Sequence, residues 1–115
     1  MRHYRLRLAA EVARDLDQIE DYLFRIYQEL GDDPATAADH AAHRIEEALG
    51  YLRSFTTHPH RGTEQPAIRP GIRTVTSNRI IVYFEIDDLL EEVRILAVFF
   101  GGLDHRRQIL DRLRH

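Results

Sequence analysis

An excess of positive charge that could capture an anion lies in the middle of the chain. Residues 51–80 contain five arginines and a single acidic residue, Glu64, although the 115-residue chain has a formal net charge of −3. All 16 basic residues are arginines, whose planar guanidinium groups suit bidentate capture of carboxylate or phosphate. This basic segment therefore indicates a local anionic target or an acidic partner, or else arginines that only solvate a long loop.

Other kinds of chemistry have few candidate residues. The chain lacks cysteine and lysine, which excludes disulfides, thiolate metal sites and a catalytic lysine. His58-Pro59-His60 has no evident third ligand, so we expect no metal, and Gly101-Gly102 lacks the flanking pattern of a phosphate-binding loop. We therefore expect no cofactor. No apolar run is long enough to span a membrane and residues 1–8 do not resemble a signal peptide, so a cytoplasmic protein without membrane contact is expected.

The first half of the chain predicts one strand and two helices. Residues 4–8 alternate apolar and charged side chains, which predicts a half-buried strand. Apolar residues three or four apart then predict a helix over residues 10–30, ended by Gly31. Asp32 or Asp33 is expected to cap a second helix that reaches about residue 55, with Pro34 in its first turn. The expected inward residues of this antiparallel hairpin are Val12, Leu16, Ile19, Leu23, Ile26, Leu30, Ala38, Ala41, Ala42, Ile45, Leu49 and Leu52.

The second half predicts a β-meander and a final helix. Three of the four prolines fall in residues 58–71, which predicts a loop. Strands are expected over residues 72–76, 80–86 and 93–100, with turns at Ser77-Asn78 and Asp87-Asp88, and a helix over 103–113. The prediction is one α+β domain over residues 1–115, ordered β-α-α-β-β-β-α. Its helical hairpin packs on one face of a mostly antiparallel sheet and leaves the other face for water or a partner.

Three stretches in this order resemble the RelE/ParE superfamily, the toxins of bacterial type II toxin–antitoxin systems, a group that includes plasmid-stabilisation proteins. The first is the opening strand at residues 4–8 with the helix that follows it. The second is the helix end at residues 48–55 with Pro59, Arg61-Gly62, Gly71 and Arg73. The third comprises residues 81–84, 93–96 and 98–102. The resemblance covers nearly the whole chain and implies that family's fold.

The resemblance also implies a growth-inhibiting toxin that a cognate antitoxin neutralises by wrapping it. ParE-like members block DNA gyrase, whereas RelE-like members cut messenger RNA on the ribosome, using basic residues and a tyrosine or histidine near the last strand. Phe100 stands about where that proton carrier would be, and phenylalanine cannot transfer a proton. Inhibition of gyrase is therefore slightly favoured. The alternatives are a messenger RNA endonuclease and an inactive module that only binds the antitoxin, so whether the chain is an enzyme stays open.

The candidate site residues follow from these alternatives. Contact with the target, whether gyrase or ribosome and messenger RNA, is assigned to Arg61, Arg69, Arg73 and Arg79. In the ribonuclease alternative the catalytic set would be Arg73, Arg79, Arg61 and Tyr83, because RNA cleavage needs a proton carrier and positive charge beside the phosphate. The other possible proton carriers are His58, His60 and His105. The expected anchors for the antitoxin are Tyr22, Phe24, Tyr27, Phe99 and Phe100.

Overall fold

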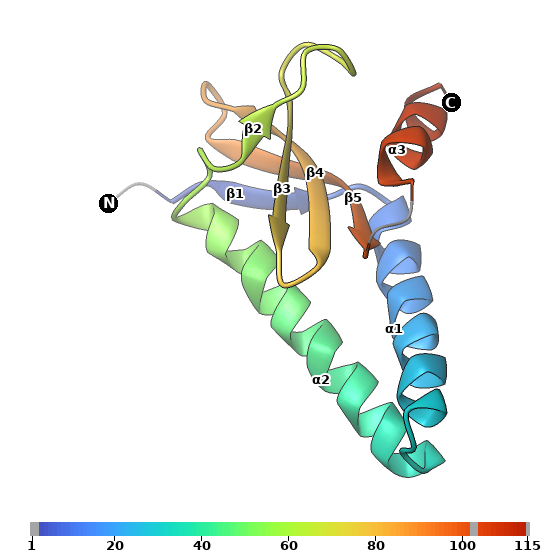
Figure 1. The fold of residues 1–115 in the computed structure, drawn as a ribbon. Coiled ribbons are helices and arrows are strands. Elements are labelled where there is room, and N and C mark those ends of the chain that lie inside the picture. Colours follow the sequence, from blue (N-terminus) through green and yellow to red (C-terminus); the bar gives the residue numbers. More distant parts are fainter. Residues whose placement is uncertain (1–2, 102–103, 115) are drawn as a thin grey trace.

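The computed structural model describes residues 3–101 and 104–114 (Figure 1). In chain order its elements are β1 (Arg5–Leu8), α1 (Glu11–Glu29), α2 (Pro34–Arg53), the 3-10 turn η1 (Ser54–Thr56), β2 (Thr63–Glu64), β3 (Ile72–Ser77), β4 (Ile80–Asp87), β5 (Glu92–Phe100) and α3 (His105–Leu113). The predicted α+β class and element order are confirmed, with β2 as an addition. Of the residues predicted to start the last helix, Leu103 lies outside the described residues and Asp104 is the N-cap. None of the described helices is both long and apolar enough to cross a membrane.

The strands form one sheet in the order β1-β5-β4-β3-β2. Strands β3, β4 and β5 are an antiparallel meander, and β1 pairs in parallel with β5, as the long connection through the two helices and the earlier strands permits. Strand β2 lies in the stretch that the prolines predicted to be a loop. It pairs Thr63 with Thr74 and Glu64 with Arg73, and a two-residue strand is too short to show any alternation in the sequence.

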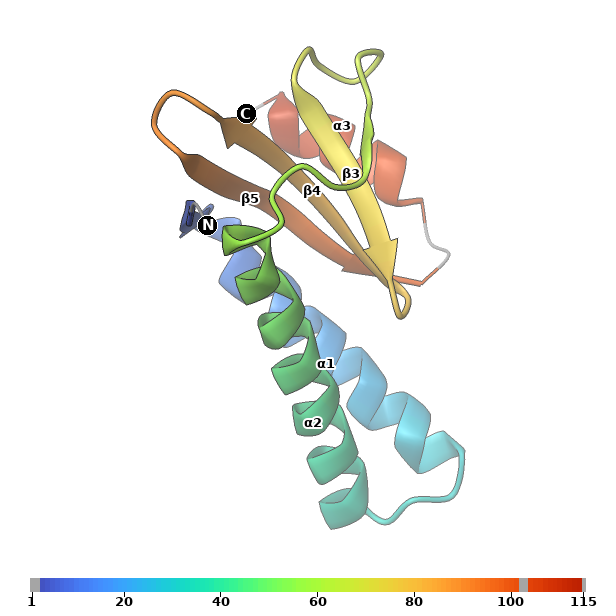
Figure 2. The same cartoon turned by 90° about the vertical axis from the view of Figure 1, so that its left-hand side faces the viewer.

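The helical hairpin extends beyond the sheet, as Figures 1 and 2 show. Gly31 ends α1 with φ of +113°, a conformation that glycine adopts without steric cost. Of the two candidate caps, Asp33 is the one used: its carboxylate accepts the backbone N–H of Thr36 at 2.8 Å. Asp32 instead contacts the imidazole of His40 at 2.7 Å. The hairpin turn is therefore held by two separate side-chain contacts.

The inward face of α2 differs from the prediction. Ala37, Ala41, Ala48 and Leu52 are buried, whereas Ala38 and Ala42 are exposed. The error arises because alanines crowd the first half of this helix, and a small side chain does not determine which face packs inward. Leu30, predicted as part of the inward stripe of α1, is 77% exposed because it lies at the far end of the hairpin.

Both faces of the sheet are covered. Ile80, Val82 and Phe84 of β4 pack in one core with the two long helices, while Ile81 and Tyr83 pack in a second core with Ile109 of α3. Figure 2 shows α3 behind strands β3–β5, with α2 on the near side. The expectation that this second face stays open is therefore wrong, because α3 folds back over it.

A bulge in β5 decides which of its side chains reach each core. Tyr83 pairs with Ala97 but Phe84 pairs with Ile95, so Leu96 has no partner residue in β4. Successive side chains of a strand alternate between the two faces of the sheet, and the extra residue exchanges the faces for the residues that follow it. Before it Ile95 faces the long helices, and after it Ala97 and Phe99 face α3. Consequently Phe99 is buried on the α3 side, and its neighbour Phe100 is half-buried against the core of the long helices.

Candidate functional site

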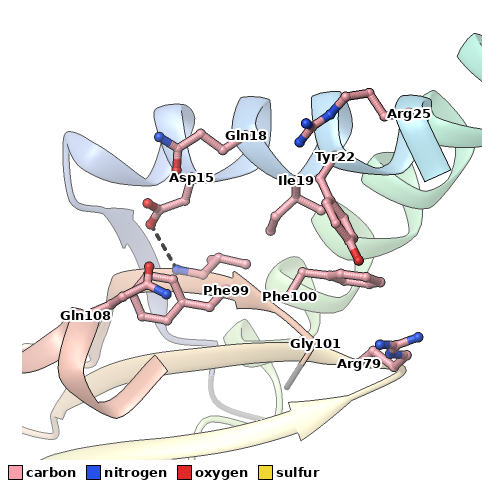
Figure 3. A pocket seen from close by; sticks show the side chains of 11 residues that line it. Asp15, Gln18, Ile19, Tyr22, Arg25, Arg79, Phe99, Phe100, Gly101 and Gln108 are labelled. Carbon is pink, nitrogen blue, oxygen red and sulfur yellow. Dashed lines mark hydrogen bonds between the residues drawn. The ribbon is translucent and has the colours of Figure 1, made fainter. Parts of the chain in front are cut away.

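A pocket of about 420 Å³ lies between α1 and the end of β5 (Figure 3). Helix α1 supplies one wall with residues three or four positions apart, from Asp15 to Tyr22 and Arg25, because that spacing brings side chains onto one face of a helix. The end of β5 supplies the opposite wall, including Phe100, and Arg79 closes one end. Two elements distant in the sequence and one turn thus meet at a single concave surface.

Aromatic rings form the apolar part of the pocket. The ring of Tyr22 lies 5.9 Å from that of Phe100, measured between centroids, with the planes tilted by 54°. Tyr22 is nevertheless 38% exposed. The pocket therefore presents an accessible aromatic surface at its rim, as Figure 3 shows.

Arginines surround the Phe100 ring. The guanidinium of Arg79 lies 5.1 Å from the ring centroid and that of Arg44 lies 5.7 Å from it, both within the range of cation–π contact. Arg44 also donates to the carbonyl oxygen of Asn78 at 2.8 Å, which ties α2 to the β3–β4 turn. Within residues 3–101 and 104–114, neither Arg79 nor Arg25 is paired with a carboxylate. The pocket therefore has two cations that no carboxylate of the described residues neutralises.

The turn that carries Arg79 is unusual. Asn78 has φ of +50° and Arg79 has φ of +68°, as a two-residue type I′ turn between paired strands requires. The predicted turn at Ser77-Asn78 is thus displaced by one residue, since Ser77 still pairs with Ile80. Positive φ costs a residue with a Cβ atom about 1–2 kcal/mol, and glycine is the favoured residue at this second position. An arginine therefore occupies a position that suits glycine.

An ion pair closes the inner end of the pocket. Asp15, only 4% exposed, receives two hydrogen bonds from Arg112, each 2.7 Å long, and a third from the backbone N–H of Val98 at 3.0 Å. The hydrogen bond to Asp15 raises the pKa of Arg112 above its ordinary value. Arg112 also donates to the carbonyl oxygen of the bulged Leu96 at 3.2 Å. This cluster fastens α3 to α1 and to the bulge.

Sequence reasoning missed this ion pair, although the sequence contained one signal of it. Asp15 lies three residues after Val12 and four before Ile19, so it falls on the apolar stripe of α1. A carboxylate at such a position must find a partner on folding. Nothing in the sequence indicated that the partner would be Arg112.

Three of the four arginines predicted to contact the target have partners within the chain. Arg61 stacks on the Phe55 ring at 4.4 Å and donates to the carbonyl oxygen of Ser54 at 3.0 Å. Arg73 donates to the carbonyl oxygen of Arg61 at 3.0 Å and to Glu64 at 3.3 Å. Arg69 forms an ion pair with Glu85, with 2.8 Å between the guanidinium nitrogen and the carboxylate oxygen. These arginines organise the loop and the β2 edge, and only Arg79 lies at the pocket.

Tyr83, the proton carrier of the predicted catalytic set, lies on the opposite face of the sheet from this pocket's aromatic rim. It is 1% exposed, and its hydroxyl contacts Nδ1 of His105 at 2.8 Å beneath α3. Burial raises the pKa of Tyr83 above its ordinary value, so the phenol holds its proton more firmly than a free tyrosine. The structure therefore does not bring Tyr83 together with the predicted arginines.

The predicted antitoxin anchors fall into two groups. Tyr22, Phe99 and Phe100 all line the pocket, although most of the Phe99 ring is buried towards α3. Phe24 and Tyr27 are half-buried in the hairpin and pack against its core. The fold thus combines three of these anchors with Arg79 in one place.

The histidines of the loop lie elsewhere. Nε2 of His60 contacts Oδ1 of Asp88 at 2.8 Å, and Nδ1 of His58 contacts the hydroxyl of Thr57 at 3.0 Å. In the part of the chain that the structure describes, no three histidine or acidic side chains converge in a way that could hold a metal ion.

No protein-family model and no curated protein sequence matches the chain. Solved structures do match it. A chain of the chromosomal ParDE TA system from P. aeruginosa superposes with a TM-score of 0.66 at 19% identity, over 87% of this chain and 98% of that one. A chain of the toxin–antitoxin complex RelBE2 from Mycobacterium tuberculosis superposes with a TM-score of 0.53 at 21% identity, over 88% of this chain and 94% of that one. The chain therefore has the RelE/ParE-like fold that the sequence predicted.

Proposed function

We propose that this chain is the toxin of a bacterial type II toxin–antitoxin system, held inactive by a cognate antitoxin, and that it acts by binding DNA gyrase. The observation that carries the proposal is the fold. It is shared over nearly the full length of both chains with a component of a ParDE system and of a RelBE2 toxin–antitoxin complex. A fold alone does not determine activity, so the choice of target depends on the site.

The contacts of the candidate residues favour a toxin that binds its target over one that cuts RNA. Arg61, Arg69 and Arg73 are engaged within the chain, so they are not free to surround a phosphate. Tyr83 is buried, and its raised pKa makes it a poor base at neutral pH. These observations support the ParE-like alternative.

One contact favours the second candidate, a ribosome-dependent messenger RNA endonuclease. Tyr83 and His105 form a hydrogen-bonded pair of proton carriers. A nuclease of this kind would need α3 to leave the sheet, because α3 covers Tyr83. The Tyr83→Phe variant separates the candidates, since it removes the phenol and keeps the ring.

The test is to induce the chain in bacteria without any antitoxin and to pulse-label new DNA and new protein within minutes. We expect DNA synthesis to fall first, Tyr83→Phe to arrest growth as the parent does, and the purified chain to inhibit supercoiling by gyrase. An early fall in protein synthesis with cleaved messenger RNA, abolished in Tyr83→Phe, would instead establish the endonuclease. If neither synthesis falls while soluble chain accumulates, the toxin proposal is wrong and an inactive antitoxin-binding module remains.

A further inference from the structure

We propose that the pocket between α1 and β5 receives one large apolar side chain from an acidic segment of the partner, and that Arg79 binds the adjacent carboxylate. This rests on the proposed function in one respect: the partner is taken to be the antitoxin. The inference goes further by naming the place where the partner inserts and the chemistry of the inserted segment.

The size and lining of the pocket fit a side chain better than a whole helix. Its volume of about 420 Å³ is near the lower end of the range for sites that hold small ligands. Ile19, Tyr22 and Phe100 give it apolar walls. The half-exposed Tyr22 ring would lose its remaining contact with water when an apolar group enters, which is the main source of affinity at such positions.

The charge of the pocket is complementary to a carboxylate. Asp15, its only acidic lining residue, is already neutralised by Arg112, so it does not oppose an incoming anion. Arg79 and Arg25 have no carboxylate partner within the described residues of a chain that contains 19 acidic residues. Guanidinium groups bind carboxylates with paired, charge-assisted hydrogen bonds. A carboxylate beside the apolar side chain would supply the missing anion.

The backbone at Arg79 is a second, independent observation. The residue has φ of +68° at a position where glycine would be unstrained. Its cation–π contact with Phe100 is partly exposed to water and offsets only about 0.5–1 kcal/mol of the strain. Strained residues of this kind concentrate at binding sites, where their side chains have a role that glycine could not fill. The guanidinium of Arg79 is therefore assigned to the partner.

The surroundings favour a peptide over a nucleic acid. Asp17 and Asp21 are exposed on α1, within about two turns of Tyr22, and the whole chain is acidic. These charges repel a polyanion whose phosphates must follow the surface, and the repulsion acts over the roughly 10 Å of the Debye length at 0.1 M salt. A peptide with a single carboxylate at the pocket avoids most of this repulsion.

The test is an NMR titration of the isotope-labelled full chain, made by cell-free synthesis, with small probes of opposite charge. The first probe is N-acetyl-phenylalanyl-glutamate amide, and the second has lysine in place of glutamate. We expect the glutamate peptide to give saturable shifts at the amides of Tyr22, Arg79 and Phe100. The lysine peptide should bind about tenfold more weakly, as the loss of a charge-assisted hydrogen bond predicts.

Variants identify the groups responsible. Arg79→Gly removes the cation and relaxes the turn, so it should weaken the glutamate peptide about tenfold while the chain stays folded. Arg53→Gln is the matched control: it removes an exposed arginine from the end of α2, which is not part of the pocket, and should leave binding unchanged.

Three results would overturn the proposal. Equal binding of the two peptides would exclude recognition of the carboxylate. Absence of shifts at the pocket with millimolar glutamate peptide would exclude insertion of the side chain. Stronger binding of the dinucleotide UpU at the same amides would make the pocket a nucleic-acid site. The growth-arrest experiment contains no antitoxin, so its failure refutes the proposed function, whereas failure of the titration refutes only the pocket.

Discussion

Replacement of Asp15 by alanine should destabilise the protein more than its position on a long helix suggests. The substitution leaves the backbone N–H of Val98 without its acceptor, which costs about 1–3 kcal/mol when the group is buried. It also leaves Arg112 without its carboxylate. Breaking a fully buried ion pair costs about 3–5 kcal/mol, but the Arg112 side chain is 23% exposed and can turn towards water, so we take about 1–2 kcal/mol. The expected loss in the free energy of unfolding is about 3 kcal/mol.

Urea unfolding measures this loss. With a slope of about 1.5 kcal/mol per molar urea, the midpoint should fall by about 2 M while the slope itself stays constant. Asp15→Asn is a second informative variant, because the side-chain oxygen of asparagine can still accept the N–H of Val98 and only the charge is lost. Its loss in the free energy of unfolding should be about half of that of Asp15→Ala. Asp17→Ala, on the exposed face of the same helix, is the control and should change stability by less than about 0.5 kcal/mol.

A double-mutant cycle with Arg112→Leu decides whether the ion pair is the cause. If it is, Arg112→Leu should lower the free energy of unfolding much less in the Asp15→Ala background than in the parent, because the ion pair is already broken. A midpoint shift below about 0.5 M in Asp15→Ala, with unchanged slope, would refute the reasoning. Unchanged hydrogen-exchange protection of the Val98 amide would refute the assignment of its acceptor.

Four other substitutions test three separate features of the fold. Gly62→Ala should lower the thermal unfolding midpoint strongly, because φ is +72° and the new Cβ would lie 2.3 Å from a backbone oxygen of β3. Gly71→Ala should lower the midpoint much less, because φ is +87° but no atom lies within 4 Å of the new Cβ. Asp33 has a pKa lowered by the backbone N–H of Thr36, so its stabilising effect should be present above about pH 3.8 and lost as pH falls through the folded-state pKa. A stability difference between parent and Asp33→Ala that persists on acidification would contradict this cap. Tyr83 has a pKa raised by burial, so its stabilising effect should be complete below about pH 10 and lost as pH rises through the folded-state pKa. Tyr83→Phe should accordingly unfold less readily in alkali, and equal alkaline sensitivity of the two proteins would count against a buried phenol.

Local patterns in the sequence are enough to predict the order of the helices and of every strand except β2. The alternation at the start of the chain, the three-and-four spacing of α1 and the prolines of the loop are patterns among near neighbours, which each segment expresses wherever it folds. Gly31 and the two aspartates after it similarly located the hairpin turn. Of the aromatic and basic residues that line the pocket, Tyr22, Arg79, Phe99 and Phe100 are recognisable in the sequence as binding candidates by type, whereas Arg25 was missed.

How these residues meet depends on contacts between segments that are distant in the sequence. Neighbouring residues of a strand face opposite sides of the sheet, and the bulge at Leu96 decides that Phe99 faces α3 while Phe100 faces the long helices. The partner of Asp15 lies 97 residues away, and the carboxylate has no preference for it until β5 and α3 are in place. Arg79 reaches Phe100 because the two strand ends are paired. Such contacts join segments distant along the chain, and local periodicity contains no information about which distant segment will lie opposite.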